Sequence, residues 1–205
     1  MSDLVRSPLQ ADWFVTGFFT PDYRALAERL TKGLDALDVR YHLFAKDKGS
    51  TPWRFVTRWK PTIVLQAMDL YPEKTIVLLD VDATVLGDIS QMVNFTGDVS
   101  VHSNARMKKR PFIRSRVKVH MSARSMVFKP TPAARKLAEN WRRECDDPEG
   151  IYPKTAAETP LLIAAMRTSG LSLHAMDARW SARETSSARA DAVIVHESER
   201  ARTTA

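Results

Sequence analysis

The sequence is short of cysteine and of long apolar runs, and each shortage excludes a class of structure. The single cysteine, Cys145, cannot form an internal disulfide or a cysteine metal cluster, so we interpret it as a buried or unreactive thiol in a reducing compartment. No stretch approaches the roughly 20 apolar residues that span a bilayer. Residues 1–13 lack the basic-then-apolar order of a signal peptide. These absences predict a cytoplasmic protein.

Acidic residues are missing from the stretch between Arg106 and Lys118, where seven of the thirteen residues are Lys or Arg. With a formal net charge of +7 for the chain, this favours anionic partners. Nucleic-acid binders usually interleave such a run with aromatic residues, and only Phe112 is present, so we do not expect nucleic acid. Two interpretations stay open. The run is a solvated mobile loop, or it binds an anionic acceptor or a membrane surface at which the protein is peripheral.

The chain does have enough apolar residues for one core. At 205 residues with 44% hydrophobic residues, it fits a single domain over 1–205. Disorder, if present, is expected at residues 1–10 and 201–205, because chain ends are the least restrained segments. We find no internal repeat and no linker.

Strands and helices are predicted to alternate along the first 80 residues. Continuous apolar runs at 13–19, 39–45 and 75–79 are typical of buried strands. Between them, 22–37 and 57–70 have helical spacing of apolar residues. This order predicts an α/β fold with a mostly parallel central sheet flanked by helices. Further elements are predicted as strands at 98–103, 120–129, 171–176 and 191–198, and as helices at 132–145 and 158–170.

Asp80 and Asp82 follow the apolar run 75–79, at the strand end where ligands gather in such sheets. The spelling DVDAT resembles the first motif of haloacid-dehalogenase phosphatases, in which Asp80 would be the nucleophile and magnesium would bind the phosphate. That family needs a later acidic pair after a buried strand. The pair that this chain offers, Asp146 and Asp147, ends a polar helix instead.

The same aspartates can serve a different chemistry. Carboxylates at i and i+2, where a strand ends, can turn toward one divalent ion. Such an ion neutralises the charge that develops on a nucleotide diphosphate when a glycosidic bond breaks. Burying two carboxylates without a cation is costly, which favours a metal here.

Four segments together resemble GT-A fold glycosyltransferases, and in particular the glycogenin-like members of family 8. They are KPTIVLQAMDLYPEKTIVLLDVDATVLGDIS from Lys60, SMVFKPTPAARKLAENW from Ser125, ETPLLIAAM from Glu158, and AVIVHES from Ala192. The resemblance covers roughly residues 12–200 in order and spacing. It implies a GT-A fold and a metal-dependent, hexosyltransferase-like enzyme that takes a sugar from a nucleotide diphosphate donor, with UDP as the expected nucleotide.

The resemblance also implies a metal site. Asp80 and Asp82 would bind Mn²⁺ or Mg²⁺, with Asp80 also touching the donor, and His196 would be the third protein ligand. An imidazole ligand would favour manganese. The alternative for His196 is a hydrogen-bonded residue at a strand end.

Donor-binding residues follow from the same resemblance. Phe18, Phe19 and Thr20 would contact the nucleotide base and ribose, although core packing explains a phenylalanine equally well. Lys60 would pair with a phosphate or a donor hydroxyl.

Two further residues complete the implied site. Glu158 would bind the donor sugar or assist catalysis, the alternative being a favourable acid in the first turn of a helix. Arg200, with Arg202, would reach the diphosphate, the alternative being a basic tail.

The sequence departs from the family pattern in two places. Ser122, Ala123 and Arg124 stand where relatives often have Asn-Ser-Gly, and Thr159 stands where glutamine is common. The acceptor, which could be a glycan, a lipid-linked group or a protein, stays open, as do the stereochemistry and the oligomeric state. A non-catalytic module that binds nucleotides or polyanions is the remaining alternative.

Overall fold

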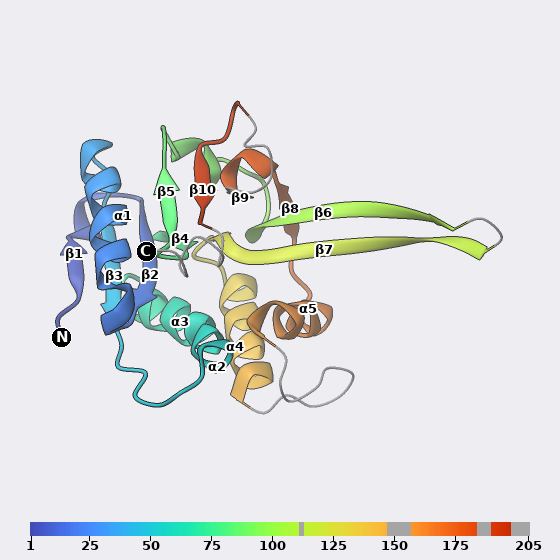
Figure 1. Cartoon of the computed structure of the whole chain (residues 1–205), viewed down its shortest axis with the longest axis horizontal. Helices are drawn as coiled ribbons and strands as arrows, with labels where there is room; N and C mark the ends of the chain where they lie inside the picture. Colours follow the sequence, from blue (N-terminus) through green and yellow to red (C-terminus); the bar gives the residue numbers. More distant parts are fainter. Residues whose placement is uncertain (111–112, 147–156, 184–189, 198–205) are drawn as a thin grey trace.

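The computed structural model describes residues 1–110, 113–146, 157–183 and 190–197. For 104–110 and 113–120 this description covers the backbone. A seven-stranded sheet runs through the centre of the molecule in the spatial order β1-β3-β2-β4-β7-β6-β8 (Figure 1). Its strands are β1 (Leu4–Arg6), β3 (Tyr41–Ala45), β2 (Trp13–Phe19), β4 (Thr75–Leu79), β7 (Ile113–Phe128), β6 (Val99–Arg110) and β8 (Leu173–Met176).

Most of these strands point the same way. β3, β2 and β4 are parallel neighbours, and β8 is parallel to β6. β7 is antiparallel to both β4 and β6, so β6 and β8 share the direction of β4, and only β1 and β7 run against the other five described strands. The prediction of a mostly parallel α/β sheet is therefore confirmed.

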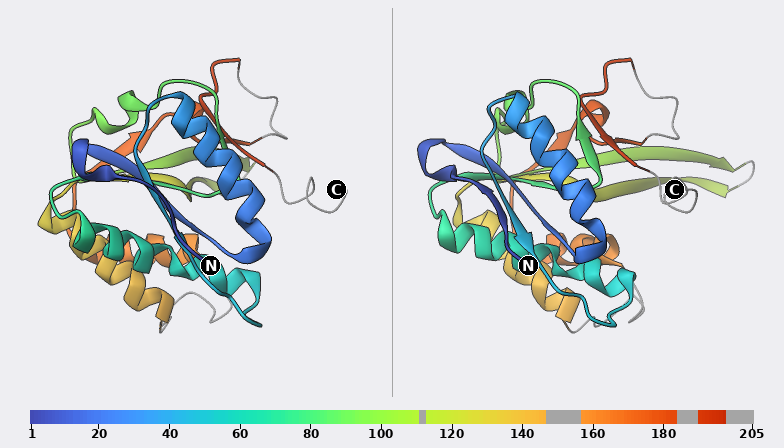
Figure 2. Two further views of the ribbon diagram at one scale, coloured as in Figure 1. Left: turned by 90° about the vertical axis from the view of Figure 1, so that its left-hand side faces the viewer. Right: turned by 60° about the vertical axis from the view of Figure 1, so that its left-hand side comes forward.

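Helices cover one face of the sheet, and a helix with a second small sheet covers the other (Figure 2). The first face carries α3 (Lys60–Leu70), α4 (Pro132–Asp146) and α5 (Glu158–Ser169). The second carries α1 (Arg24–Ala36) and three short strands. Those strands are β5 (Ala83–Val85), β10 (Ile194–His196) and β9 (Ala182–Arg183). The remaining helical turns are α2 (Trp53–Val56), η1 (Pro8–Gln10), η2 (Pro21–Tyr23), η3 (Thr57–Trp59), η4 (Ser90–Val93) and η5 (Ala178–Trp180).

The apolar residues of β2 serve both faces in turn. Phe14 and Phe18 pack with the helices of the first face, and Val15 and Phe19 pack with α1 and the small sheet. This follows from the two-residue period of a strand, and it explains why the run is continuously apolar. Each such side chain contributes roughly 1.5–3 kcal/mol when fully buried. Packing against both cores therefore holds β2, and with it the end of the strand, in place.

Gly17 allows β2 and β4 to approach closely where β4 ends. A Cβ atom at this position would lie 2.5 Å from the carbonyl oxygen of Leu79, which real structures do not tolerate. The missing side chain thus fixes the path of the chain immediately before Asp80.

The strands β6 and β7 form a long hairpin that extends beyond the body of the molecule (Figure 1). Two interpretations were open for residues 106–118, and the solvated mobile loop is wrong as to secondary structure, because 106–110 and 113–118 are paired strands in the described backbone. At the root of the hairpin the register shifts, so that Val101 pairs with Met126 and His102 with Ser122. The bulged residues 123–125 of β7 lie beside the end of β4.

Most predicted elements agree with the structure, and the differences lie at their ends. The predicted helix 57–70 begins as a 3-10 turn and becomes α-helical at Lys60, with Pro61 in the first turn. Within residues 1–10, one of the two ends where any disorder was expected, Leu4–Arg6 pairs with β3 and a 3-10 turn follows it. Residues 201–205 lie outside the described residues. None of the described helices is both long and apolar enough to span a bilayer.

Candidate functional site

Asp80 and Asp82 lie in the turn that leaves the central sheet. The backbone N–H of Asp80 donates to the carbonyl of Arg124 in the β7 bulge at 2.9 Å, and the N–H of Ala83 donates back to the Asp80 carbonyl at 3.0 Å. Val81 between them is buried, while both aspartates are partly accessible. The turn therefore fixes the spacing of the two carboxylates at the carboxyl end of β4, as predicted.

His196 reaches the same place from the other end of the chain. β10 pairs antiparallel with β5 so that His196 lies opposite Ala83, next to Asp82. Its ring is fully buried, and Nδ1 lies 3.2 Å from Oδ1 of Asp82. The backbone N–H of Glu197 donates to the Asp82 carbonyl at 3.3 Å. The small sheet thus brings together residues 114 positions apart in the sequence.

One ligand atom from each of Asp80, Asp82 and His196 can be chosen so that all three lie within 4.8 Å of one another. Two carboxylate oxygens and one imidazole nitrogen suit a divalent ion such as Mn²⁺, and they are compatible with Mg²⁺. The three predicted ligands are therefore adjacent, and their donor chemistry fits the implied metal.

A buried lysine lies beside these ligands. Lys60, in the first turn of α3, has 4% of its side chain exposed. Its Nζ lies 2.7 Å from Oδ1 of Asp80 and 3.0 Å from Oε1 of Glu158, and it donates to the carbonyl of Ala123 at 3.2 Å. All three donor positions of the ammonium group thus have partners. Trp141 helps to hold the backbone of Glu158 in place, because its Nε1 donates to the Glu158 carbonyl at 3.0 Å.

The charges at this site shift one another's ionisation. Burial alone would lower the pKa of Lys60, but the carboxylates of Asp80 and Glu158 raise it above its ordinary value. Burial alone would raise the pKa of Glu158, and the Lys60 charge holds it below the usual range. For Asp80, burial and the nearby Asp82 raise the pKa, although Lys60 opposes the shift. Lys60 and Glu158 are therefore charged at neutral pH.

The residues predicted for the nucleotide lie deeper than expected. Phe18 and Phe19 are buried in the two cores on opposite faces of the sheet. The buried Thr20 donates its hydroxyl to Oδ1 of Asp22 at 2.6 Å. The structure thus brings these three residues to the end of β2, where their rings and hydroxyl already have partners. Arg200, and Arg202 after it, lie outside the described residues.

Aromatic residues that the sequence reasoning did not select lie next to the end of β2. The rings of Tyr23 and Trp53 stack with centroids 4.4 Å apart and planes 2° from parallel. Both are only partly buried. A stacking pair separated by 30 positions leaves no local signal in the sequence, although an aromatic shortly after the first strand could have been noted.

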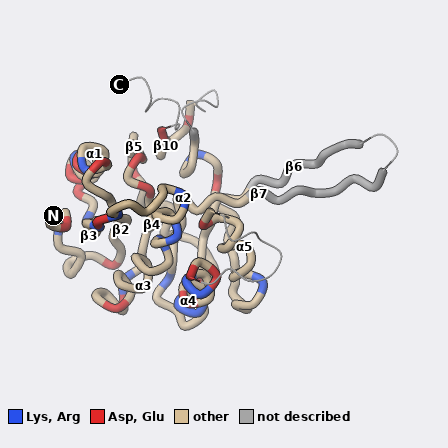
Figure 3. Tube along the Cα trace, turned by 60° about the horizontal axis from the view of Figure 1, so that its bottom comes forward, with Lys and Arg blue, Asp and Glu red and all other residues tan. Residues whose placement is uncertain are grey.

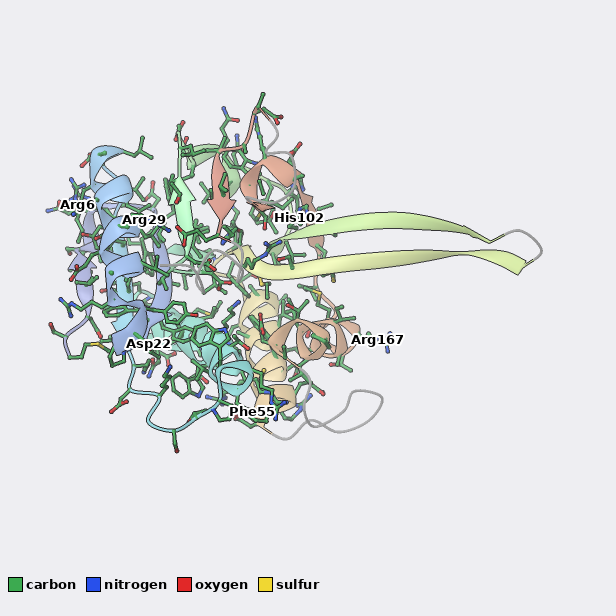
Figure 4. The ribbon with its side chains drawn as sticks, viewed as in Figure 1. Arg6, Asp22, Arg29, Phe55, His102 and Arg167 are labelled. Atoms are coloured by element: carbon green, nitrogen blue, oxygen red, sulfur yellow. The ribbon has the colours of Figure 1, made fainter. Side chains whose placement is uncertain are left out.

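Two more contacts around His196 were also missed. Oγ of Ser125 lies 2.9 Å from Nε2 of His196, and both residues are fully buried. From the solvent side, Arg29 of α1 (labelled in Figure 4) pairs with Glu197 and donates to the carbonyl of Asp82 at 3.4 Å. Neither contact has a sequence signature, because each depends on how separate elements pack.

Comparisons with solved structures identify proteins with a similar fold. No protein-family model and no curated protein matches the sequence. Among solved structures, a glycosyltransferase involved in the glycosylation of the major capsid of PBCV-1 is 13% identical, with a TM-score of 0.64 over 89% of this chain and 92% of that one. The galactosyltransferase LgtC, in complex with donor and acceptor sugar analogs, is 10% identical, with a TM-score of 0.52 over 89% and 86%.

A third solved structure is the glycosyltransferase GlyE of Streptococcus pneumoniae TIGR4. It is 12% identical, with a TM-score of 0.52 over 90% of this chain and 54% of that one. These likenesses show that the chain has the GT-A fold of such glycosyltransferases, as the resemblance in its motifs predicted.

Proposed function

We propose that this chain is a metal-dependent glycosyltransferase that moves a hexose from a nucleotide diphosphate sugar, with UDP as the nucleotide, to an acceptor. The observation that carries the proposal is the convergence of Asp80, Asp82 and His196 within 4.8 Å, at the carboxyl end of a GT-A sheet. The buried pair of Lys60 and Glu158 lies directly beside them.

Asp80, Asp82 and His196 would hold Mn²⁺ or Mg²⁺. The ion would supply Lewis-acid stabilisation of the departing diphosphate. The protein's own contribution is positional, because the Asp80 turn and the small sheet present their ligand atoms from a rigid frame.

Lys60 and Glu158 have distinct roles in this proposal. Glu158 is ionised, because its pKa is held below the usual range, so it is suited to accept a hydrogen bond from a donor-sugar hydroxyl and unsuited to act as a general acid. Its charge also stabilises positive charge that develops on the transferring sugar. Lys60 contacts both Glu158 and Asp80, so it would hold the residue that binds the donor sugar at a fixed distance from a metal ligand.

For the nucleotide, backbone groups at the end of β2 keep the role proposed for Phe18 to Thr20, because their side chains are already engaged. The partly exposed stack of Tyr23 and Trp53 is a better surface for a base. Arg200 stays a proposed diphosphate contact.

The charge distribution bears on the acceptor. Among the residues that Figure 3 colours by charge, acidic and basic positions are mixed over the body of the molecule, and α4 carries both. The sequence concentrates basic residues between Arg106 and Lys118, and this run is the candidate contact for an anionic acceptor or surface. We propose that this run binds one, and test it by sedimentation with vesicles that contain or lack anionic lipid.

The functional proposal is tested by a thermal-shift screen of nucleotide sugars with and without Mn²⁺, followed by product analysis. A transferase should be stabilised by one sugar nucleotide only when Mn²⁺ is present, and should release free nucleotide diphosphate. Orthophosphate release from a monoester would instead support the phosphatase alternative. Binding without either product would indicate a non-catalytic module.

A further inference from the structure

The buried hydroxyl of Ser125 occupies the side of the His196 ring that faces away from Asp82. Ser125 belongs to the bulged part of β7 and lies opposite Leu79 of β4, one residue before Asp80. Its Oγ is 2.9 Å from Nε2 of His196, and both side chains have 0% exposure. The ring is therefore held between two polar groups, with no solvent at either nitrogen.

The two contacts determine which ring nitrogen can carry the proton. The other nitrogen, Nδ1, lies 3.2 Å from Oδ1 of Asp82. A carboxylate only accepts hydrogen bonds, so a neutral His196 must carry its proton on Nδ1 in the metal-free protein. The unprotonated Nε2 then accepts a hydrogen bond from the Ser125 hydroxyl.

Nδ1, facing Asp82, is also the nitrogen on the side of the other proposed metal ligands. Nε2 could reach an ion there only if the buried ring turned over, which would break its contact with Ser125 and leave a buried hydroxyl without its partner.

We infer that His196 binds the divalent ion through Nδ1, and that Ser125 is the positioning residue that makes this possible. The inference rests on the proposed function, since it concerns the same metal site. A neutral ring that binds the ion through Nδ1 carries its one proton on Nε2 instead of Nδ1. The Ser125 hydroxyl changes from donor to acceptor.

A hydroxyl is well suited to this exchange because it can donate or accept by rotating its hydrogen. A methyl group at position 125 can do neither. Partners that orient a metal-binding histidine typically contribute 10–100-fold to metal affinity. We therefore expect Ser125→Ala to weaken Mn²⁺ binding by 10–100-fold.

The test measures Mn²⁺ affinity by electron paramagnetic resonance of the free ion, without nucleotide. Ser125→Ala is measured beside a second pair of variants, Ser125→Thr and Ser125→Val. Threonine and valine have the same shape, but threonine has a hydroxyl where valine has a methyl group. Thr should retain affinity better than Val by at least tenfold. Ser100→Ala serves as the matched control, because Ser100 is also a buried serine in a strand of the same sheet, where it lies opposite Val127 of β7. Thermal unfolding in EDTA establishes that each variant is folded.

A second readout follows the ring itself. Nitrogen NMR of His196 should show the proton on Nδ1 in metal-free protein and on Nε2 with Mg²⁺. Equal Mn²⁺ affinity for Ser125→Ala and wild type, or a proton that stays on Nδ1 with metal bound, would overturn the inference while leaving the metal site standing. If wild type itself fails to bind Mn²⁺, the metal role in the proposed function is lost, and Asp82→Asn will show no further decrease.

Discussion

The two aspartates of the site are supported in different ways. Asp80 leaves the central sheet, and its carboxylate lies 2.7 Å from a buried lysine that also binds Glu158. Asp82 leads into the small sheet, and the contact described for its carboxylate is the imidazole of His196 at 3.2 Å. The Asp80 half thus contains a buried ammonium group, whereas the Asp82 half contains a buried imidazole that Ser125 contacts. From this comparison we expect the contact between Asp80 and Lys60 to contribute more to the free energy of unfolding. We expect the pair of Asp82 and His196 to contribute more to the affinity for the metal ion.

The largest effect should come from removing the cation of the Asp80 half. Lys60→Met leaves the partly buried Asp80 carboxylate and the buried Glu158 carboxylate without their partner, and breaking such a pair typically costs about 3–5 kcal/mol in the free energy of unfolding. Urea denaturation in EDTA measures this, and Mn²⁺ should restore part of the loss by taking over Asp80. Lys136→Met, at an exposed position of α4, is the control. A change below 1 kcal/mol would show that the pairing contributes little.

Breaking the Asp82 half should have the opposite profile. Asp82→Asn removes a charged metal ligand, so we expect Mn²⁺ affinity to fall at least 100-fold, about 2.8 kcal/mol at 1.4 kcal/mol per tenfold change. Stability in EDTA should fall less than in Lys60→Met, because the amide oxygen of the asparagine can still accept a hydrogen bond from Nδ1 of His196. Asp88→Asn, which alters an exposed acid bonded to Ser90, is the matched control. Wild-type Mn²⁺ affinity in Asp82→Asn would contradict the assignment.

Glu158 should contribute to stability in a pH-dependent way. Its folded-state pKa lies below the ordinary 4.5, so its stabilisation is fully present above pH 4.5 and is lost as the pH falls through the folded-state value. Glu158→Gln should therefore cost about 1–3 kcal/mol at neutral pH, and the difference from wild type should shrink in acid. Denaturation curves at several pH values measure it. A difference that does not vary with pH would exclude this linkage.

The smallest effect on Mn²⁺ affinity is expected from the ion pair between Arg29 of α1 and Glu197, which follows β10. Arg29 and Glu197 form a partly exposed pair, and ion pairs that water reaches contribute about 0–1 kcal/mol. Arg29→Gln should lower Mn²⁺ affinity by less than threefold. Arg24→Gln, which breaks the Arg24–Glu28 pair on the same helix, controls for loss of a surface charge. A tenfold loss for Arg29→Gln alone would mean that β10 is positioned from outside rather than by Ser125.

The contrast also explains what could be predicted from the sequence. Asp80 and Asp82 follow a short continuous apolar run, so their placement at the end of a buried strand could be predicted from that run. His196 required a family resemblance, because its strand has only three residues and gives no periodic signal. Ser125 could not be found, since its role depends on the register between β7 and β4 and on the β7 bulge.

The resemblance assigned Phe18 and Phe19 to the nucleotide, but it could not show that adjacent residues of a strand buried on both faces enter opposite cores. A loop stayed open as one interpretation of the hairpin because its basic residues hide the alternation that predicts strands.

The most direct test of the central claim is calorimetry of UDP binding with and without Mn²⁺, on wild type and Asp82→Asn. If Asp80, Asp82 and His196 hold an ion that carries the diphosphate, wild type should bind UDP at least tenfold more tightly with Mn²⁺, and Asp82→Asn should show no such gain. Equal UDP affinity for wild type in Mn²⁺ and in EDTA would contradict the account.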